Sequence, residues 1–355
     1  MHRSPTIKIM KYTFAFLSFL LLTCGSYAQA PSQLWIKTNV GGTAQQILFD
    51  KDSNILVRYL NNFHGVSKYK PDGTLLWTKK DSTLSAGMVT DGNGSTYLCG
   101  TNTVFGKNIG RLCKIDRNGK LLWGFNYSDF SIQVNFTDIA MGTNGSLYIS
   151  AYEETIPALY AIDTNGKVLH KIWEPLSNGL GKCRLVRMDH SGNIIVAATA
   201  DTSQNFDTKP SPDLLLVKYK PDGTVIWRRA VRLDSVSINE TTLPDMKIDK
   251  QDNIIISQQG DEGANERYTS FVIKFGADGT RKWVQKFTPI VSQGLIYYWP
   301  QATRLAIAST GNVMLAGFQN TSYGSLPNFY MGELDGSNGS IVWSQNNSQL
   351  SYNTE

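Results

Sequence analysis

The sequence has little of what several large protein classes require. Of its four cysteines, three follow residue 30 at unrelated spacings, which fits neither a disulfide framework nor a Cys-x-x-Cys metal site. The histidines are few and scattered, and the chain has no Gly-x-Ser-x-Gly, P-loop or dinucleotide-binding pattern. We therefore predict no metal site. Whether a disulfide joins two of the three cysteines stays open: Cys99, Cys113 and Cys183.

Charge and long apolar runs are also sparse. The formal net charge is +5, but three of the basic residues lie among the first thirty residues, which contain no acidic one. The rest of the chain therefore carries about +2, without any run of Lys or Arg, and this excludes the electrostatic footprint of a nucleic-acid-binding protein. No segment after residue 30 is long and apolar enough to predict a transmembrane helix.

The first thirty residues have the pattern of a secretory signal peptide. Basic residues precede the apolar run FAFLSFLLL at residues 14–22, and small residues follow it. We predict cleavage after Ala28 or Ala30 and an exported protein of the periplasm, the cell surface or the medium. A minor alternative takes the Leu-Leu-Thr-Cys sequence ending at Cys24 as a lipoprotein motif, with the protein lipid-anchored through that cysteine.

What the sequence has in abundance is an internal repeat. KYKPDGTLLW at residues 68–77 returns as KYKPDGTVIW at residues 218–227, and four further segments place a glycine four residues before an aromatic residue or histidine. The six pairs are Gly73 and Trp77, Gly119 and Trp123, Gly166 and His170, Gly223 and Trp227, Gly279 and Trp283, and Gly339 and Trp343.

The repeat predicts an all-β fold. Each copy follows a second Gly, Asn or Asp turn, and runs of β-branched or aromatic residues such as IIVAATA (residues 194–200) flank the turns without any helical period. Four short strands in about 42–60 residues are typical of a β-propeller blade. We predict a single β-propeller of six four-stranded blades over residues 31–346, with seven blades as the alternative, followed by a polar C-terminal tail at residues 347–355.

The repeated residues have structural explanations. We expect the Asp-Gly and Asn-Gly pairs to supply the positive φ angles of tight hairpins, with Pro71 and Pro221 pre-setting φ in two of them. The tryptophans should fill the wedge between neighbouring blades; in the third repeat His170 makes a weaker wedge, helped by Trp173. Residues 34–38 (LWIKT) look like one more outer strand, which either joins a blade edge or changes the blade count.

The motif resembles a known family. An Asp-x-x-Gly-Asn turn followed by Lys, an aromatic residue or Ile, and Gly-x-x-x-Trp is similar to the SBBP-type bacterial β-propeller repeat, with its lysine at Lys68, Lys114, Lys218 and Lys274 and departures at Ala161 and Glu333. The Gly-x-x-x-Trp ending more distantly resembles the propeller repeats of PQQ dehydrogenases. Those enzymes imply a vicinal cysteine pair, which this chain lacks, so we predict no PQQ and no other cofactor.

Binding is expected on one face of the propeller. Strand alternation places all the long loops on the face opposite the tight turns, and variable loops on a rigid scaffold commonly carry function. Two groups on that face are candidate ligand-binding residues. Tyr297, Tyr298 and Trp299 gather in one loop and could instead seal two blades together, whereas Asp138, Asp245 and Arg304 take equivalent positions at the channel mouth and could instead pair with one another.

These observations favour a binding or scaffold module for a protein or glycan of the cell envelope, with no catalytic residue assigned. The alternative is a polysaccharide hydrolase or lyase that uses Asp138, Asp245 and Glu240 as acid and base.

Overall fold

The fold is seen in a computed structural model, which describes residues 43–60, 64–128, 131–173, 181–200, 213–231, 237–238, 245–262, 267–287, 291–292, 295–296, 301–319 and 328–347. The chain divides into two compact units, Met1–Thr38 and Asn39–Glu355, and every described residue belongs to the second. The predicted signal peptide, the extra strand at residues 34–38 and the aromatic loop at 297–299 lie outside the described residues.

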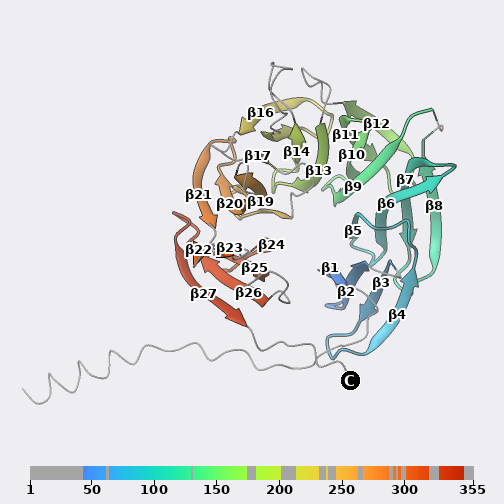
Figure 1. The fold of residues 1–355 in the computed structure, drawn as a ribbon. Coiled ribbons are helices and arrows are strands. Elements are labelled where there is room, and N and C mark those ends of the chain that lie inside the picture. The colour runs from blue at the N-terminus through green and yellow to red at the C-terminus, as the bar shows by residue number, and fades with distance from the viewer. Residues whose placement is uncertain are drawn as a thin grey trace, which may run out of the picture. The chain divides into compact units, whose positions relative to one another are not determined.

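The second unit is a β-propeller whose blades follow one another in chain order around a ring (Figure 1). Blade 1 contains β1 (Thr43–Phe49), β2 (Ile55–Leu60), β3 (Gly65–Tyr69) and β4 (Leu75–Lys80). Blade 2 contains β5 (Gly87–Thr90), β6 (Thr96–Val104), β7 (Lys107–Ile115) and β8 (Leu121–Tyr127). Blade 3 contains β9 (Val134–Met141), β10 (Leu147–Glu153), β11 (Ile156–Ile162) and β12 (Val168–Trp173).

The second half of the ring repeats this order. Blade 4 contains β13 (Gly181–Met188), β14 (Ile194–Ala200), β15 (Asp213–Tyr219) and β16 (Val225–Val231). Blade 5 contains β18 (Asp245–Ile248), β19 (Ile254–Glu262), β20 (Arg267–Phe275) and β21 (Arg281–Phe287), with β17 (Ser237–Ile238) as a second short strand beside β19. Blade 6 contains β24 (Gln301–Ile307), β25 (Val313–Gln319), β26 (Asn328–Leu334) and β27 (Ile341–Asn347). The prediction of six blades is confirmed.

Few elements depart from the blade pattern. Two short strands, β22 (Val291–Ser292) and β23 (Leu295–Ile296), pair with each other between blades 5 and 6. All described secondary structure is strand or turn, and the described ranges hold no helix of membrane-spanning length and hydropathy.

The repeated hairpin uses its Asp-Gly pair differently from the prediction. In the turn of blade 1 only Gly73 has a positive φ, 83°, and its N–H donates to the Lys70 carbonyl. Asp72 instead accepts the N–H of Thr74 through its side chain at 2.8 Å. Together with the hydrogen bond from the Lys70 N–H to the Thr74 carbonyl, this pattern identifies a three-residue loop with a glycine bulge at Gly73. The expectation of positive φ at the residue before the glycine is therefore wrong for this hairpin, because the aspartate serves as an acceptor.

Hydrophobic clusters fill five of the interfaces between consecutive blades. The cluster between blades 1 and 2 contains Leu56, Met88 and Leu98, each 1% exposed or less, and corresponding clusters join blades 2 and 3, 3 and 4, 4 and 5, and 5 and 6. Among the described residues no such cluster joins blades 6 and 1. Strand β1 instead leaves Ile47 and Phe49 57% and 67% exposed on the face turned away from blade 2. This sixth interface is called the seam below.

A recurring polar contact, here called the blade clasp, explains the repeated Lys and Trp. Lys68 Nζ lies 2.7 Å from Asp50 Oδ2, in the turn between β1 and β2. The same Nζ and Trp77 Nε1 both donate to the carbonyl of Arg117, in the last hairpin of blade 2, at 3.3 and 3.1 Å. The Trp77 ring also packs against Gly119, so closely that a Cβ on this glycine would lie 2.8 Å from the nearest ring atom. The buried ion pair lies within blade 1 and fixes the lysine, and blade 1 contacts blade 2 through the two hydrogen bonds and the aromatic ring.

Two further blades repeat the clasp. In blade 4, Lys218 pairs with Asp189 at 2.7 Å, and Lys218 and Trp227 both donate to the Ala277 carbonyl. Blade 5 repeats this with a pair between Lys274 and Asp249 at 2.9 Å, and with Trp283 and Lys274 donating to the Gly336 carbonyl.

The remaining blades substitute other groups. In blade 3, Tyr148 supplies a donor to the Pro221 carbonyl at 3.4 Å, and Ile172 rather than His170 comes nearest to Gly223. The side chain of Trp173 lies outside the described ones, so its expected assistance stays a prediction. In blade 6, Trp343 donates to Glu333 of its own blade at 2.6 Å.

Candidate binding site in the central channel

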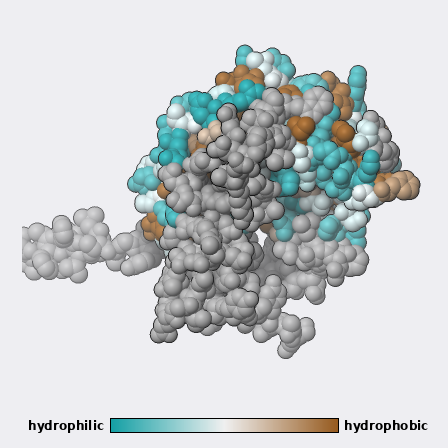
Figure 2. Space-filling view, turned by 45° about the horizontal axis from the view of Figure 1, so that its top comes forward, coloured by the Kyte–Doolittle hydropathy of each residue, from teal (hydrophilic) through white to brown (hydrophobic). Residues whose placement is uncertain are grey.

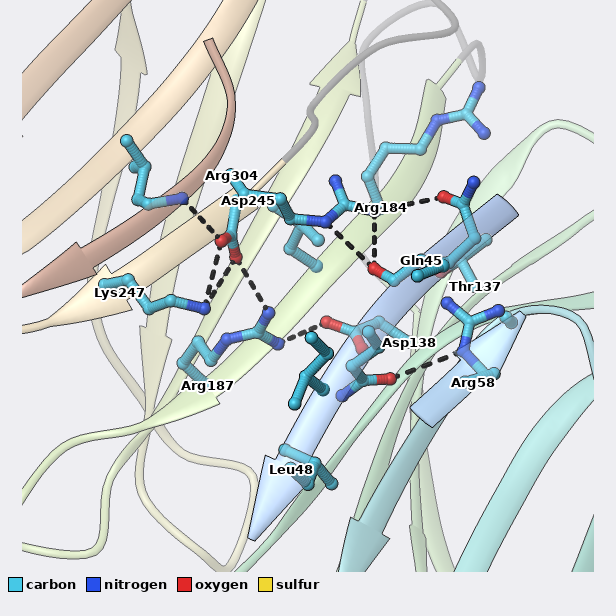
Figure 3. Close-up of a pocket in the computed structure, with 16 residues that line it drawn as sticks. Gln45, Leu48, Arg58, Thr137, Asp138, Arg184, Arg187, Asp245, Lys247 and Arg304 are labelled. Atoms are coloured by element: carbon cyan, nitrogen blue, oxygen red, sulfur yellow. Dashed lines mark hydrogen bonds and ion pairs between the residues drawn. The ribbon is translucent and has the colours of Figure 1, made fainter. Parts of the chain in front are cut away.

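The ring encloses a cavity of about 530 Å³ at its axis, within the range usual for small-molecule sites. Its walls come from the inner strands β1, β9, β13, β18 and β24, together with Arg58 of β2 and Ala86. Figure 3 shows the polar side chains converging on this space from opposite walls. The polar and charged lining residues are Gln45, Gln46, Arg58, Thr137, Asp138, Arg184, Arg187, Asp245, Lys247 and Arg304.

Bulges in the inner strands aim these side chains. The register of the inner strand shifts once in four blades, at Gln45, Thr137, Arg184 and Thr303. In blades 2 and 5 the strand β5 or β18 begins at the equivalent point, at Gly87 and Asp245. Because a bulge turns its extra residue out of the regular alternation, the bulged residue and the residue after it both line the cavity in blades 1, 3 and 4.

Three of the equivalent wall positions carry acceptors that tie one blade to the next. Gln46 Oε1 accepts the N–H of Met88 at 3.0 Å. Asp138 Oδ2 accepts the N–H of Val186 at 3.2 Å. Asp245 Oδ2 accepts the N–H of Leu305 at 3.0 Å. Buried backbone N–H groups need an acceptor, and these three side chains supply it.

One arginine holds both carboxylates. Arg187 forms ion pairs with Asp138 through Nη1 and with Asp245 through Nη2, the latter at 3.4 Å. Lys247 Nζ adds contacts of 3.0 Å to both oxygens of Asp245. Burial lowers the pKa of Arg187, but the two carboxylates outweigh this effect and raise the pKa above its usual value. Arg187 and Lys247 thus hold both carboxylates, and Arg184 adds a further positive charge from the same strand as Arg187.

Two further guanidinium groups line the cavity from blades 6 and 1. Arg304 donates to the Gln45 carbonyl at 2.9 and 2.7 Å and to the side-chain oxygen of the same residue at 3.1 Å, which joins blade 6 to blade 1. Arg58, 6% exposed, donates to the side-chain oxygen of Gln46 at 3.4 Å and to the Ser85 carbonyl. Burial lowers the pKa of Arg58, and the nearby charge of Arg304 lowers it further, against the opposing effect of Cys99 and Asp138.

The structure brings three of the predicted candidates together. Asp138, Asp245 and Arg304 all line the cavity; the two aspartates share Arg187, and Arg304 lies in the neighbouring blade, beside the Leu305 amide that donates to Asp245. Tyr297, Tyr298 and Trp299 lie outside the described residues. Sequence alignment missed Arg58, Arg187 and Lys247, although the last two stand two residues after wall positions and so share their side of the strand.

This arrangement favours binding over proton transfer. Asp245 accepts from Arg187, Lys247 and the amides of Met246 and Leu305, so its oxygens are committed to fixed donors. A general base needs an oxygen within reach of substrate. The cysteines offer no alternative nucleophile, because Cys99, Cys113 and Cys183 are buried free thiols, and burial raises the pKa of the first two.

On the side seen in Figure 2 the described surface is mostly hydrophilic, with hydrophobic groups in small separate areas. The most exposed of the large hydrophobic residues is Phe105, 97% exposed at the tip of the hairpin between β6 and β7, with a φ of 49°.

Solved structures share this fold at low sequence identity. A protein from Lactobacillus plantarum aligns with a TM-score of 0.54 at 12% identity, over 85% of this chain and 84% of its own. A PL25 polysaccharide lyase, an ulvan lyase bound to -[GlcA(1-4)Rha3S]-, aligns with a TM-score of 0.55 at 10% identity, over 83% and 81%. A protein of unknown function from Bacteroides caccae aligns with a TM-score of 0.50 at 12% identity, over 83% and 94%. The comparison with curated proteins gives no match.

The family comparison agrees with the fold. Residues 28–209, half of the chain, match the family model PQQ_2, described as outer membrane protein assembly factor BamB. The matched range runs through blades 1 to 3 and into blade 4, and it includes the first three copies of the repeat motif and the clasp of blade 1. Together with the six-bladed ring, this match shows that the chain belongs to the PQQ_2 family of BamB-like propellers.

Proposed function

We propose that the protein is an exported binding module of the cell envelope that takes up part of a protein or glycan ligand in the channel cavity. The observation that carries this proposal is a preformed polar cavity of about 530 Å³ whose two carboxylates are committed to fixed partners. The family description, an assembly factor for outer membrane proteins, supports an envelope location and a binding role. The closer resemblance to SBBP-type repeats stays a prediction.

The hydrolase or lyase alternative has less support. It needs a carboxylate free to exchange a proton with a sugar, whereas Asp138 and Asp245 each accept from Arg187 and from a backbone amide. Glu240 lies outside the described residues. The ulvan lyase shares the fold at 10% identity, and this likeness does not extend to its chemistry.

Binding assays with a blocked channel test the proposal. Purified protein is screened against a glycan panel and against solubilised envelope proteins, next to the variant Ile47→Trp, whose larger side chain fills the cavity from an exposed position. We expect a ligand to bind the wild type, and its affinity for Ile47→Trp to be at least tenfold lower. Phe105→Ser, at a distant hairpin tip, should bind the ligand as the wild type does. Absence of any ligand under saturating conditions would contradict the proposal.

A further inference from the structure

Basic side chains gather on one part of the outer edge of the ring. The outer strands β16 and β21 belong to neighbouring blades (Figure 1). The other outer strands carry fewer basic residues: two lysines on β4, one on β12, and none on β8 or β27. On β16 and β21 together, five basic residues are exposed and no residue is acidic: Arg228, Arg229, Arg281, Lys282 and Lys286. Folding thus collects these residues, called the basic patch below, from two segments that are far apart in the sequence.

Two of these cations contact the hairpin between β20 and β21. Arg229 Nη2 donates to the Asp278 carbonyl in that hairpin at 3.3 Å. The Lys282 side chain packs on the same hairpin, where a Cβ on Gly276 would lie 2.8 Å from Lys282 Cε. Arg281, the first residue of β21, is exposed next to Lys282 in the sequence. Blades 4 and 5 therefore present cations to one stretch of surface.

One carboxylate offsets part of this charge. Asp278 accepts the N–H and the hydroxyl of Thr280 at 3.0 and 2.7 Å. These hydrogen bonds, with the charge of Lys282 as a smaller effect, hold the pKa of Asp278 below its usual value, so it is ionised at neutral pH. Within the described ranges Arg229, Arg281 and Lys282 form no ion pair with a carboxylate. Three cations against one carboxylate leave this surface with a net positive charge.

Aliphatic side chains accompany the cations on both strands. Ile226 on β16 and Val284 on β21 are 42% and 37% exposed. Long basic side chains can lay their methylene groups along such a surface while their charged ends reach phosphate groups. A single sugar or peptide is usually recognised in a pocket that fixes its position, and the channel cavity contains none of these residues. The surface of an anionic bilayer instead attracts exposed cations and apolar groups together.

We infer that the basic patch docks on the surface of an anionic lipid bilayer, where Arg229, Arg281 and Lys282 contact headgroup phosphates. This contact goes beyond the proposed channel function and does not depend on it. It holds the propeller by its outer edge, so the channel axis runs along the bilayer and the entrance to the cavity stays open.

Vesicle sedimentation with the purified protein tests this inference. The vesicles contain phosphatidylcholine with or without phosphatidylglycerol, and we expect binding only where phosphatidylglycerol is present, weakening as salt is added. Each basic residue near an anionic surface contributes about fivefold, so Arg281→Gln with Lys282→Gln should weaken binding about tenfold or more. The matched control is Lys79→Gln with Lys80→Gln, two adjacent lysines at the end of β4, with an expected change of about threefold or less.

Arg229 needs two variants, because its guanidinium also lies over the Trp227 ring. Arg229→Gln should weaken binding about fivefold, whereas Arg229→Lys keeps the charge and should change binding about twofold or less. Ile47→Trp, in the channel, should bind vesicles as the wild type does, which separates this contact from the proposed function. Equal binding to both kinds of vesicle, equal effects of the two double variants, or binding to soluble polygalacturonate but not to vesicles would overturn the inference.

Discussion

The tight-turn ends of the blades and the central channel use charged residues in different ways. At the tight turns, one lysine pairs with one aspartate in three closely similar clasps, each within 2.9 Å, and a looser pair between Lys114 and Asp91 at 3.9 Å follows the same plan. In the channel the equivalent wall positions change from blade to blade, with Gln46, Asp138, Asp245 and Arg304 among them. In a repeat protein, a charged contact that recurs from blade to blade is scaffold, whereas charge that departs from the repeat marks a candidate site.

Breaking one clasp should have the largest effect on stability. In Asp189→Ala, Lys218 is left buried without its countercharge, and losing one partner of a buried pair costs about 3–5 kcal/mol. Chemical denaturation followed by tryptophan fluorescence measures the change. The exposed pair of Arg117 and Asp52, 3.0 Å apart, is the control, and Asp52→Ala should cost less than about 1 kcal/mol. Equal losses in the two variants would contradict the scaffold role of the clasp.

Acid should weaken the clasps in a defined range of pH. Burial raises the pKa of Asp50, but hydrogen bonds from Lys68 and Asn54 outweigh it and lower the pKa to about 2, and the pKa values of Asp189 and Asp249 are also lowered. A lowered folded-state pKa stabilises the protein above the unfolded-state value, near 4, and this contribution disappears as the pH falls toward 2.

The contribution of Asp50 is about 2 kcal/mol at neutral pH. The free energy of unfolding, measured by denaturant titration from pH 5 to pH 2, should therefore fall less steeply in Asp50→Asn than in the wild type. Parallel curves would show that Asp50 keeps an ordinary pKa in the folded protein.

Glycine substitutions should separate the packing of the clasp from its turn geometry, with a smaller effect. Gly279 and Gly311 have similar positive φ angles, 80° and 89°, but a Cβ on Gly279 would lie 2.9 Å from Arg229 Cγ and 3.1 Å from the Trp227 ring, whereas one on Gly311 would meet nothing within 4 Å. Both alanine variants lose about 1 kcal/mol to the left-handed conformation. Gly279→Ala should lose about 1 kcal/mol more, because the Arg229 side chain and the Trp227 ring must shift. Similar thermal midpoints in the two variants would show that close packing against Gly279 does not contribute to stability.

The repeat made the blades predictable because turn chemistry and strand alternation are local. Gly73, Pro71 and Trp77 lie within seven residues of one another, so sequence alone identifies the hairpin. The pairing of Lys68 with Asp50 was missed although both residues belong to the motif, because their separation varies with the intervening loop, from 18 residues in blade 1 to 29 between Asp189 and Lys218.

The site was only partly predictable. Equivalent strand positions placed Asp138, Asp245 and Arg304 at the channel, since those positions follow from aligning the turns. Arg58 lies on the second strand rather than the inner one, and its approach to the cavity depends on how β2 packs against a bulged β1. Bulges break strict alternation, so the side-chain directions at Gln45 and Arg184 follow from the folded sheet and not from the period of the sequence.

The seam has a consequence for how the ring assembles. Every other interface joins blades that follow one another along the chain, whereas the hydrogen bonds from Arg304 to Gln45 connect residues 259 positions apart. Closing so long a loop is slow but adds little entropy cost, since each doubling of length costs only about 0.6 kcal/mol. We therefore expect the blades to stack in sequence as an open arc and to close at the seam last. The same contact should be the first to part when the protein unfolds.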